Sequence, residues 1–268
     1  MVNGFHTCFH RIESFIMRRT MPFVTVVVVF GAMVPVFGGD QSKSRSARSE
    51  PLKIALHYDF FLTDGSTISD ASGNKLDGML SDGVIVEGRG KNAVKFDGKG
   101  MISVPNAPDT LDPSRRLFTV GALCQPSTPD GVVLSMGDKT NGFSLYLKGG
   151  VPHFAIRAKG VLTKVAGTEP VPLDQWVHLA GTLDEKGAAW LIINTWPEAH
   201  AKAALLSSKP IEPFCVGADP GAPVSDDTSS KNWHGLIQDV RLYWGRMTLE
   251  ENREEFKDWA RMPGCGCK

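Results

Sequence analysis

The chain has 268 residues, and its 29 Lys and Arg balance 29 Asp and Glu, so the formal net charge is zero. This balance argues against a nucleic-acid binder that works through bulk positive charge. Hydrophobic residues make up 42% and charged residues 22% of the chain, values near the globular average that exclude disorder along its whole length. The length suits one large β domain or two small ones.

The N-terminal segment has the pattern of a secretory signal. Arg18 and Arg19 precede an apolar run of 15 residues at 23–37, and two glycines follow it. Charge, a short apolar run and small residues in this order predict a signal peptide at residues 1–39, because a bilayer span needs about 20 apolar residues. An uncleaved anchor is the alternative. We expect a secreted protein, or one held in the periplasm or cell envelope, with no stable membrane span after cleavage.

The rest of the chain has the pattern of an all-β domain. Polar residues 40–51 predict a flexible linker. From residue 52, runs with period-two alternation predict strands with one buried face, and the Gly, Pro, Asn and Asp residues between them predict an antiparallel sandwich over residues 52–260. The expected strands lie at 56–60, 93–96, 101–104, 118–123, 132–136, 143–147, 153–157, 176–180, 189–193, 214–216 and 236–243, with turns at 97–100 and 149–150.

The C-terminal region predicts one short helix and a tail. Thr248 and Glu251 have the spacing of a capping box, and the helical pattern continues to Trp259. Residues 261–268 form the expected tail, whose C-x-C pair has too few ligands for a zinc site.

Two further cysteines, Cys124 and Cys215, each lie in an apolar run. Lone core cysteines usually act as small hydrophobic residues, and a disulfide between the two is the alternative in an exported protein.

Four segments in a fixed order resemble a known family. They are D-A-S-G-N with D-G at residues 70–78, A-V-K-F-D-G at 93–98, W-V-H-L-A-G-T-L-D at 176–184, and W-H-G-L-I-Q-D-V-R-L-Y at 233–243. Residues 52 to about 256 are therefore similar to the laminin G-like jelly roll of the concanavalin A-like lectin/glucanase fold. The resemblance implies an antiparallel jelly-roll β-sandwich with a short C-terminal helix. Two positions depart from the family pattern: Thr195 follows Asn194 where the family has Asn-Gly, and Cys124 stands where it often has Trp.

The sequence lacks the motifs that hydrolases of this fold use. A glucanase needs E-x-D-x-x-E on one strand, so that acid and nucleophile share a face, and this motif does not occur. We therefore expect no enzyme but a secreted, non-catalytic binding module for a glycan or a cell-surface partner such as an extracellular protein. The alternatives are a structural or protein-interaction domain of the cell envelope, an accessory module linked to secreted sulfatases or glycosidases, and, last, an unrecognised hydrolase.

Two sets of residues are candidates for ligand contact. Trp196 lies beside Pro197 in an expected turn, where an exposed aromatic ring can stack on a sugar or a partner protein; packing at an edge is the alternative. The resemblance also implies a structural Ca²⁺ held by a carboxylate on the last strand and by a glycine turn. Asp239, Asp97 and Gly98 match these positions, and Asp59 adds a ligand if the first and last strands pair. The alternative is that the turn aspartate caps its own backbone.

Overall fold

The structure is a computed structural model that describes residues 52–61, 63–105, 108–229 and 231–257. The predicted signal peptide, the linker 40–51, Trp259 and the tail with its two cysteines lie outside the described residues.

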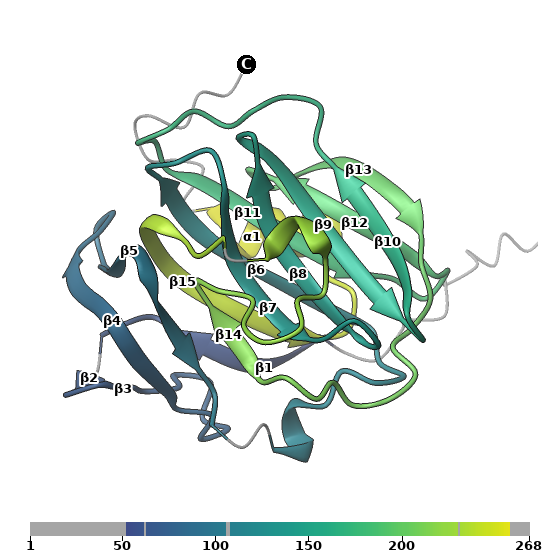
Figure 1. Ribbon diagram of the computed structural model, residues 1–268, viewed down its shortest axis with the longest axis horizontal. Coiled ribbons are helices and arrows are strands. Elements are labelled where there is room, and N and C mark those ends of the chain that lie inside the picture. Colours follow the sequence, from purple (N-terminus) through teal and green to yellow (C-terminus); the bar gives the residue numbers. More distant parts are fainter. Residues whose placement is uncertain (1–51, 62, 106–107, 230, 258–268) are drawn as a thin grey trace, which may run out of the picture. The chain divides into compact units, whose positions relative to one another are not determined.

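Two layers of antiparallel strands face each other, in the hydrogen-bonded order β10-β9-β8-β7-β14-β5-β15-β6-β11-β12-β13 (Figure 1). This arrangement confirms the predicted all-β jelly-roll sandwich. The first layer contains β7 (Gly131–Gly137), β8 (Gly142–Lys148), β9 (Val151–Ala158), β10 (Val161–Ala166) and β14 (Phe214–Val216). The second contains β6 (Phe118–Pro126), β11 (Val177–Leu183), β12 (Ala188–Ile193), β13 (Trp196–Lys202) and β15 (His234–Trp244), with β1 (Lys53–Tyr58) beside β15.

One long strand, β5 (Asn92–Ser103), joins the two layers. Its N-terminal half pairs with β15 and its C-terminal end pairs with β14. Its other edge carries β4 (Gly78–Glu87), which pairs in turn with β3 (Thr67–Ile68), and β3 pairs with β2 (Thr63–Asp64). The short helices are η1 (Asp109–Leu111), η2 (Asp226–Thr228) and α1 (Leu249–Glu255).

The predicted turn at 97–100 does not separate two strands, because the runs on both sides of it belong to β5. The four residues 97–100 lie opposite the single residue Asp82 of β4 and form a bulge, in which Gly98 takes a left-handed φ of 88°. The bulge bends the strand from one layer toward the other. An Asp-Gly pair between alternating runs is compatible with either a hairpin or a bulge, and the sequence pattern did not indicate the partner strand β4.

Three substantial strands, β4, β10 and β13, were not predicted. Most of their residues are exposed or half-buried, and in β13 none is buried. Strands of this kind bury too few side chains to leave a strong apolar alternation in the sequence.

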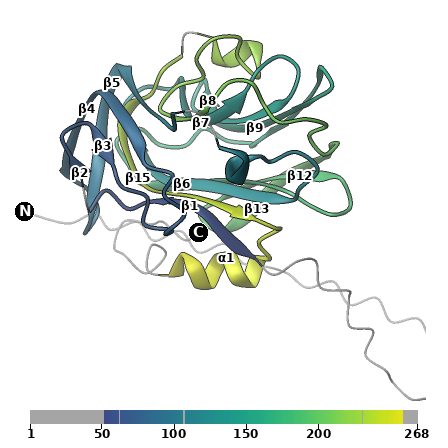
Figure 2. The same cartoon turned by 90° about the horizontal axis from the view of Figure 1, so that it is seen from below.

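The predicted capping box at the start of α1 is confirmed. Thr248 Oγ1 accepts a hydrogen bond from the Glu251 backbone N–H at 3.1 Å, and the Glu251 carboxylate accepts one from the Thr248 N–H at 2.8 Å. Figure 2 shows α1 on the outer side of the second layer. There Phe256 packs against His178 of β11 with ring centroids 4.4 Å apart. In the described part of the chain, no helix is long and apolar enough to cross a membrane.

The core between the layers is aromatic and aliphatic. Phe118 of β6 and Phe143 of β8 approach to 4.7 Å between ring centroids, which ties the two layers together. Cys124 and Cys215 are buried free thiols, so the alternative of a disulfide between them is wrong. Burial raises the pKa of the Cys215 thiol to about 12, and both cysteines act as small buried side chains.

Candidate functional site

Asp239 lies at a bulge of β15 and is completely buried on the outer face of the second layer. Its backbone has a left-handed φ of 54°, and the β15–β6 register shifts at this point. The carboxylate accepts hydrogen bonds from Arg241 Nε at 2.6 Å and Arg241 Nη2 at 2.9 Å. His57 Nε2 of β1 lies 2.8 Å from the same carboxylate, and Lys91 Nζ lies 3.7 Å from it. Asp239 therefore faces the cations of Arg241 and Lys91 and the imidazole of His57.

The same network reaches the C-terminal helix. Arg241 also pairs with Glu255 at the end of α1, and the Tyr243 hydroxyl donates to Glu255 at 2.9 Å. Burial alone would raise the pKa of Asp239, but the His57 and Arg241 contacts outweigh it and lower this pKa to about 2. The carboxylate is thus ionised and satisfied, and it helps to hold α1 against the sheet.

The residues proposed for calcium come from β1, β5 and β15. The expected pairing of β1 with β15 is present, with Tyr58 opposite Val240, but the Asp59 carboxylate accepts the Phe61 backbone N–H. Asp97 lies opposite His234, five positions along β15 from Asp239. Among the described residues, no group of three or more His, Cys, Asp or Glu could hold a metal ion. Asp239 already pairs with Arg241 and has Lys91 nearby, and calcium binding by Asp59, Asp97, Gly98 and Asp239 stays a prediction.

Trp196 is the first residue of β13 and follows a tight turn at Asn194 and Thr195, whose φ values are 50° and 70°. Its side chain is 59% exposed. The guanidinium of Arg253, from α1, lies 4.0 Å from the centre of the ring. One face of the indole is therefore covered by a neighbouring cation, and Trp196 lines neither the pocket that Trp244 lines nor the smaller one beside Trp190. Its contact with a ligand stays a prediction.

The outer face of the first layer is closed by the segment around η2. Asp227 accepts hydrogen bonds from Lys148 Nζ at 2.6 Å, Lys164 Nζ at 2.9 Å and the Tyr146 hydroxyl at 3.1 Å. Arg157 Nε donates to the backbone carbonyl of Val224 at 2.7 Å. These contacts hold the segment over β8 and β9, so this part of the face is not open to a ligand.

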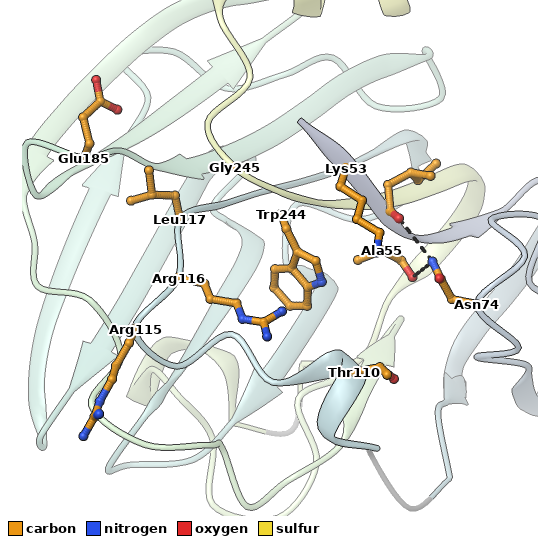
Figure 3. A pocket seen from close by; sticks show the side chains of 11 residues that line it. Lys53, Ala55, Asn74, Thr110, Arg115, Arg116, Leu117, Glu185, Trp244 and Gly245 are labelled. Carbon is orange, nitrogen blue, oxygen red and sulfur yellow. Dashed lines mark hydrogen bonds between the residues drawn. The ribbon is translucent and has the colours of Figure 1, made fainter. Parts of the chain in front are cut away.

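An open groove lies where β1 begins and β15 ends, at one end of the sandwich (Figure 3). Its volume is about 950 Å³. The half-buried indole of Trp244 packs on the core from one side, and the Arg116 guanidinium lies 5.2 Å from the ring centroid. The lining residues are Lys53, Ile54, Ala55, Asn74, Thr110, Arg115, Arg116, Leu117, Glu185, Trp244 and Gly245.

The backbone around the groove is held in place. Asn74 Nδ2 donates to the carbonyls of Ile54 and Ala55 at 3.1 and 3.0 Å, which fixes the loop between β3 and β4 to β1. Arg115 has a left-handed φ of 56°, and its N–H donates to the Leu206 carbonyl at 2.8 Å. Such a strained backbone persists only where its surroundings fix it. The groove therefore presents side chains from a preformed frame.

The charges that line the groove are unequal. Lys53, Arg115 and Arg116 are exposed cations, whereas Glu185, which is the carboxylate of the lining, pairs with Arg246 at 3.5 Å. Within the described residues, no acidic side chain forms an ion pair with Lys53, Arg115 or Arg116. The groove can thus offer free N–H donors beside an aromatic ring.

No local sequence pattern indicates this groove, because its residues come from separate segments of the chain. The local signals were small: an Arg-Arg pair at 115–116 just before a predicted strand, and Trp244 next to Gly245 at the end of another. Without the pairing of β1 with β15, nothing placed Lys53 beside Trp244.

A laminin G family model, described as the concanavalin A-like lectin/glucanases superfamily, matches residues 96–251, which is more than half of the chain. The chain belongs to the concanavalin A-like lectin/glucanases superfamily. The match confirms the family that the sequence motifs indicated. No curated protein matches the chain in sequence.

Several solved structures have the same fold as this chain. The binding domain of Paraclostridial Mosquitocidal Protein 1 is 15% identical, with a TM-score of 0.62 over 77% of this chain and 52% of that one. Domain 4 of AbnA, a GH43 extracellular arabinanase from Geobacillus stearothermophilus in complex with arabinotriose, is 21% identical, with a TM-score of 0.60 over 76% and 98%. The botulinum neurotoxin serotype G binding domain is 11% identical, with a TM-score of 0.59 over 78% and 52%. This chain thus spans about half the length of the toxin domains and nearly all of the arabinanase domain.

Proposed function

We propose that this protein is an exported, non-catalytic binding module and that the groove beside Trp244 binds a glycan. The observation that carries the proposal is a half-buried indole in an open, preformed groove. The part of the ring that the core and Arg116 leave uncovered presents an apolar surface against which a sugar ring can pack. The volume of about 950 Å³ is within the range of small-molecule sites and accommodates a short run of sugar units.

The similar structures support a binding role. The arabinanase domain is described in complex with arabinotriose, and the toxin domains are described as binding domains. The chemistry of the groove agrees, because glycoside hydrolysis needs two carboxylates that face the substrate. The carboxylate of this lining, Glu185, is engaged with Arg246.

Export is the second part of the proposal. It is supported by the charged, apolar and small-residue segments at positions 18–39. N-terminal sequencing of the protein recovered from its native source checks it, with a first residue near Gly39 expected. A mature protein that retains residues 1–39 in a membrane fraction would contradict cleavage.

The binding experiment compares two tryptophans. The purified full chain is screened on a glycan array, and each bound glycan is measured by calorimetry with the wild type, Trp244→Leu and Trp196→Leu. We expect Trp244→Leu to weaken binding at least tenfold, about 1.4 kcal/mol, and Trp196→Leu to leave it unchanged. A thermal melt of each variant separates lost binding from lost folding.

The opposite result would move the site. Binding that depends on Trp196 and not on Trp244 would place the ligand at the start of β13, as the sequence suggested. Binding to no glycan, together with capture of a defined extracellular protein, would replace the glycan proposal with a protein-interaction module.

A further inference from the structure

We infer that the groove beside Trp244 selects anionic saccharides, those whose rings carry a carboxylate or sulfate group. The inference rests on the proposed glycan-binding function and names the class of glycan. Three cations and one carboxylate line the groove, which gives it a formal charge of +2, while the whole chain has a formal charge of zero. Positive charge is therefore concentrated at this place, and a cleft lined by one sign of charge attracts ligands of the other sign.

The cations are free to bind a ligand. The acidic side chains that could neutralise them are engaged elsewhere: Glu185 with Arg246 at 3.5 Å and Asp109 with Lys209 at 2.9 Å. Asp112, in the same loop as the two arginines, accepts the Ser114 N–H and hydroxyl at 2.8 and 2.9 Å. A cation that was buried or already paired could not bind an anionic ligand. Because the nearby carboxylates have other partners, the three cations of the groove can bind an anionic group of a ligand.

The position of Arg116 gives the site its selectivity. Its guanidinium lies 5.2 Å from the centroid of the Trp244 ring, and Figure 3 shows the two side chains next to each other in the groove. A guanidinium held against an aromatic ring keeps its N–H donors in its own plane, where they match the two oxygens of a carboxylate or sulfate. The ring and the donors together fit a sugar that has an apolar face and an acidic substituent.

Lys53 and Arg115 extend the positive surface on both sides of this pair. Lys53 comes from β1, directly opposite Trp244 in the strand pairing, and Arg115 precedes Arg116 in the loop that borders the groove. In Figure 3 they lie at different places along the groove. Charges spread in this way suit a polymer with repeated acidic sugars better than a single small anion.

The experiment measures binding of the full chain to four soluble polysaccharides. Polygalacturonate carries carboxylates, dextran sulfate carries sulfates, and dextran and arabinan are the neutral counterparts. The groove variant is Lys53→Gln/Arg115→Asn/Arg116→Gln; Asn is chosen at position 115 because it tolerates a left-handed φ, and Gln at 116 keeps part of the stem that packs on Trp244. The control variant, Lys95→Gln/Lys99→Gln/Lys202→Gln, removes the same number of charges from exposed lysines that do not line the groove.

We expect the wild type to bind at least one acidic polysaccharide and to bind it less well as NaCl rises from about 0.05 to about 0.5 M. The groove variant should bind about a hundredfold more weakly, because it loses several charge-assisted hydrogen bonds, and the control variant should stay within about threefold of the wild type. The acidic polysaccharide that is bound, polygalacturonate or dextran sulfate, identifies the substituent. Thermal melts show that both variants are folded.

Three outcomes would overturn the inference. Equal or stronger binding of dextran or arabinan would refute the preference for acidic sugars while leaving the glycan-binding function in place. Equal weakening in the control variant would show that the attraction comes from the general charge of the protein and not from the groove. Binding to none of the polysaccharides or arrayed glycans would overturn both the inference and the proposed function.

Discussion

Replacement of Asp239 by Asn removes one negative charge from the buried network while it keeps the shape of the side chain. Asn also tolerates the left-handed backbone that Asp239 adopts, with φ of 54°, so the variant isolates the charge. In the wild type the carboxylate faces Arg241 at 2.6 Å and His57 at 2.8 Å. Without it, the largely buried guanidinium of Arg241 loses this partner and still pairs with Glu255.

The expected cost is about 3 kcal/mol. Removal of one member of a buried ion pair costs about 3–5 kcal/mol because the other charge stays buried, and the remaining contact of Arg241 with Glu255 favours the lower figure. In a domain of this size that loss lowers the melting temperature by roughly 10 °C.

Urea unfolding at neutral pH, followed by tryptophan fluorescence, measures the free energy of unfolding in calcium and in chelator. We expect the Asp239→Asn deficit to be the same in both, and the matched Asp97→Asn variant, whose carboxylate is exposed, to resemble the wild type. A deficit below about 0.5 kcal/mol, the usual range of surface substitutions, would refute the role of the network. Stabilisation of the wild type by calcium that both variants lose would instead establish the calcium site.

The same network predicts a dependence on acid. The pKa of Asp239 is lowered to about 2, below the value of about 3.9 for an unfolded Asp. Its contribution is therefore fully present above about pH 4 and is lost as the pH falls toward 2, which amounts to about 2 kcal/mol. The wild type should lose this stability in that window, and Asp239→Asn should show a flatter profile there.

Three further predictions concern single side chains. Asp219 is buried and its pKa is raised to about 6, so its favourable contribution is present below about pH 4 and lost as the pH rises through 6. Asp219→Asn should be more stable than the wild type at pH 7 by about 3 kcal/mol and equal to it at pH 4, and an unchanged pH profile would contradict this. Gly98→Ala places a Cβ 1.9 Å from the ring of His234, an exposed side chain that must move aside, and should cost about 2 kcal/mol in urea unfolding. Gly65→Ala, which has a similar left-handed φ but open space, should cost about 1 kcal/mol, and equal costs would exclude the clash. Thr248→Ala should lose about 1 kcal/mol with its cap, Thr248→Ser should retain most of it, and equal stability of the two variants would show that the cap contributes little.

The sequence predicted the parts of the fold whose strands are most buried. Nearly all residues of β6, β8, β11 and β15 are buried, and the apolar runs of these strands were found within a few residues of their ends. The strand β13 buries no residue, so no period marked it. The Asp97-Gly98 pair is compatible with either a hairpin turn or a bulge. Which of the two forms depends on pairing with β4, a strand that the sequence pattern did not indicate.

The candidate site was less predictable for a related reason. Local patterns report what a residue does within its own strand or turn, and they correctly placed Asp239 in the last strand. They could not show that Arg241, two positions further on, would neutralise it together with His57 from the other end of the domain. Nor could they bring Lys53, Arg116 and Trp244 to one groove, because that depends on pairings between distant segments.

The place of β15 in its sheet determines the order in which the domain can be completed. It is the last strand in the described part of the chain, yet it pairs with β1, β5 and β6 and so lies inside the sheet. Until residues 234–244 have been synthesised, all three of these strands keep open edges, which are prone to pair with other chains. Fragments truncated before residue 234 should therefore aggregate instead of forming a smaller sandwich. Folding of the domain must await synthesis of β15, because its decisive contacts join β1 and β15.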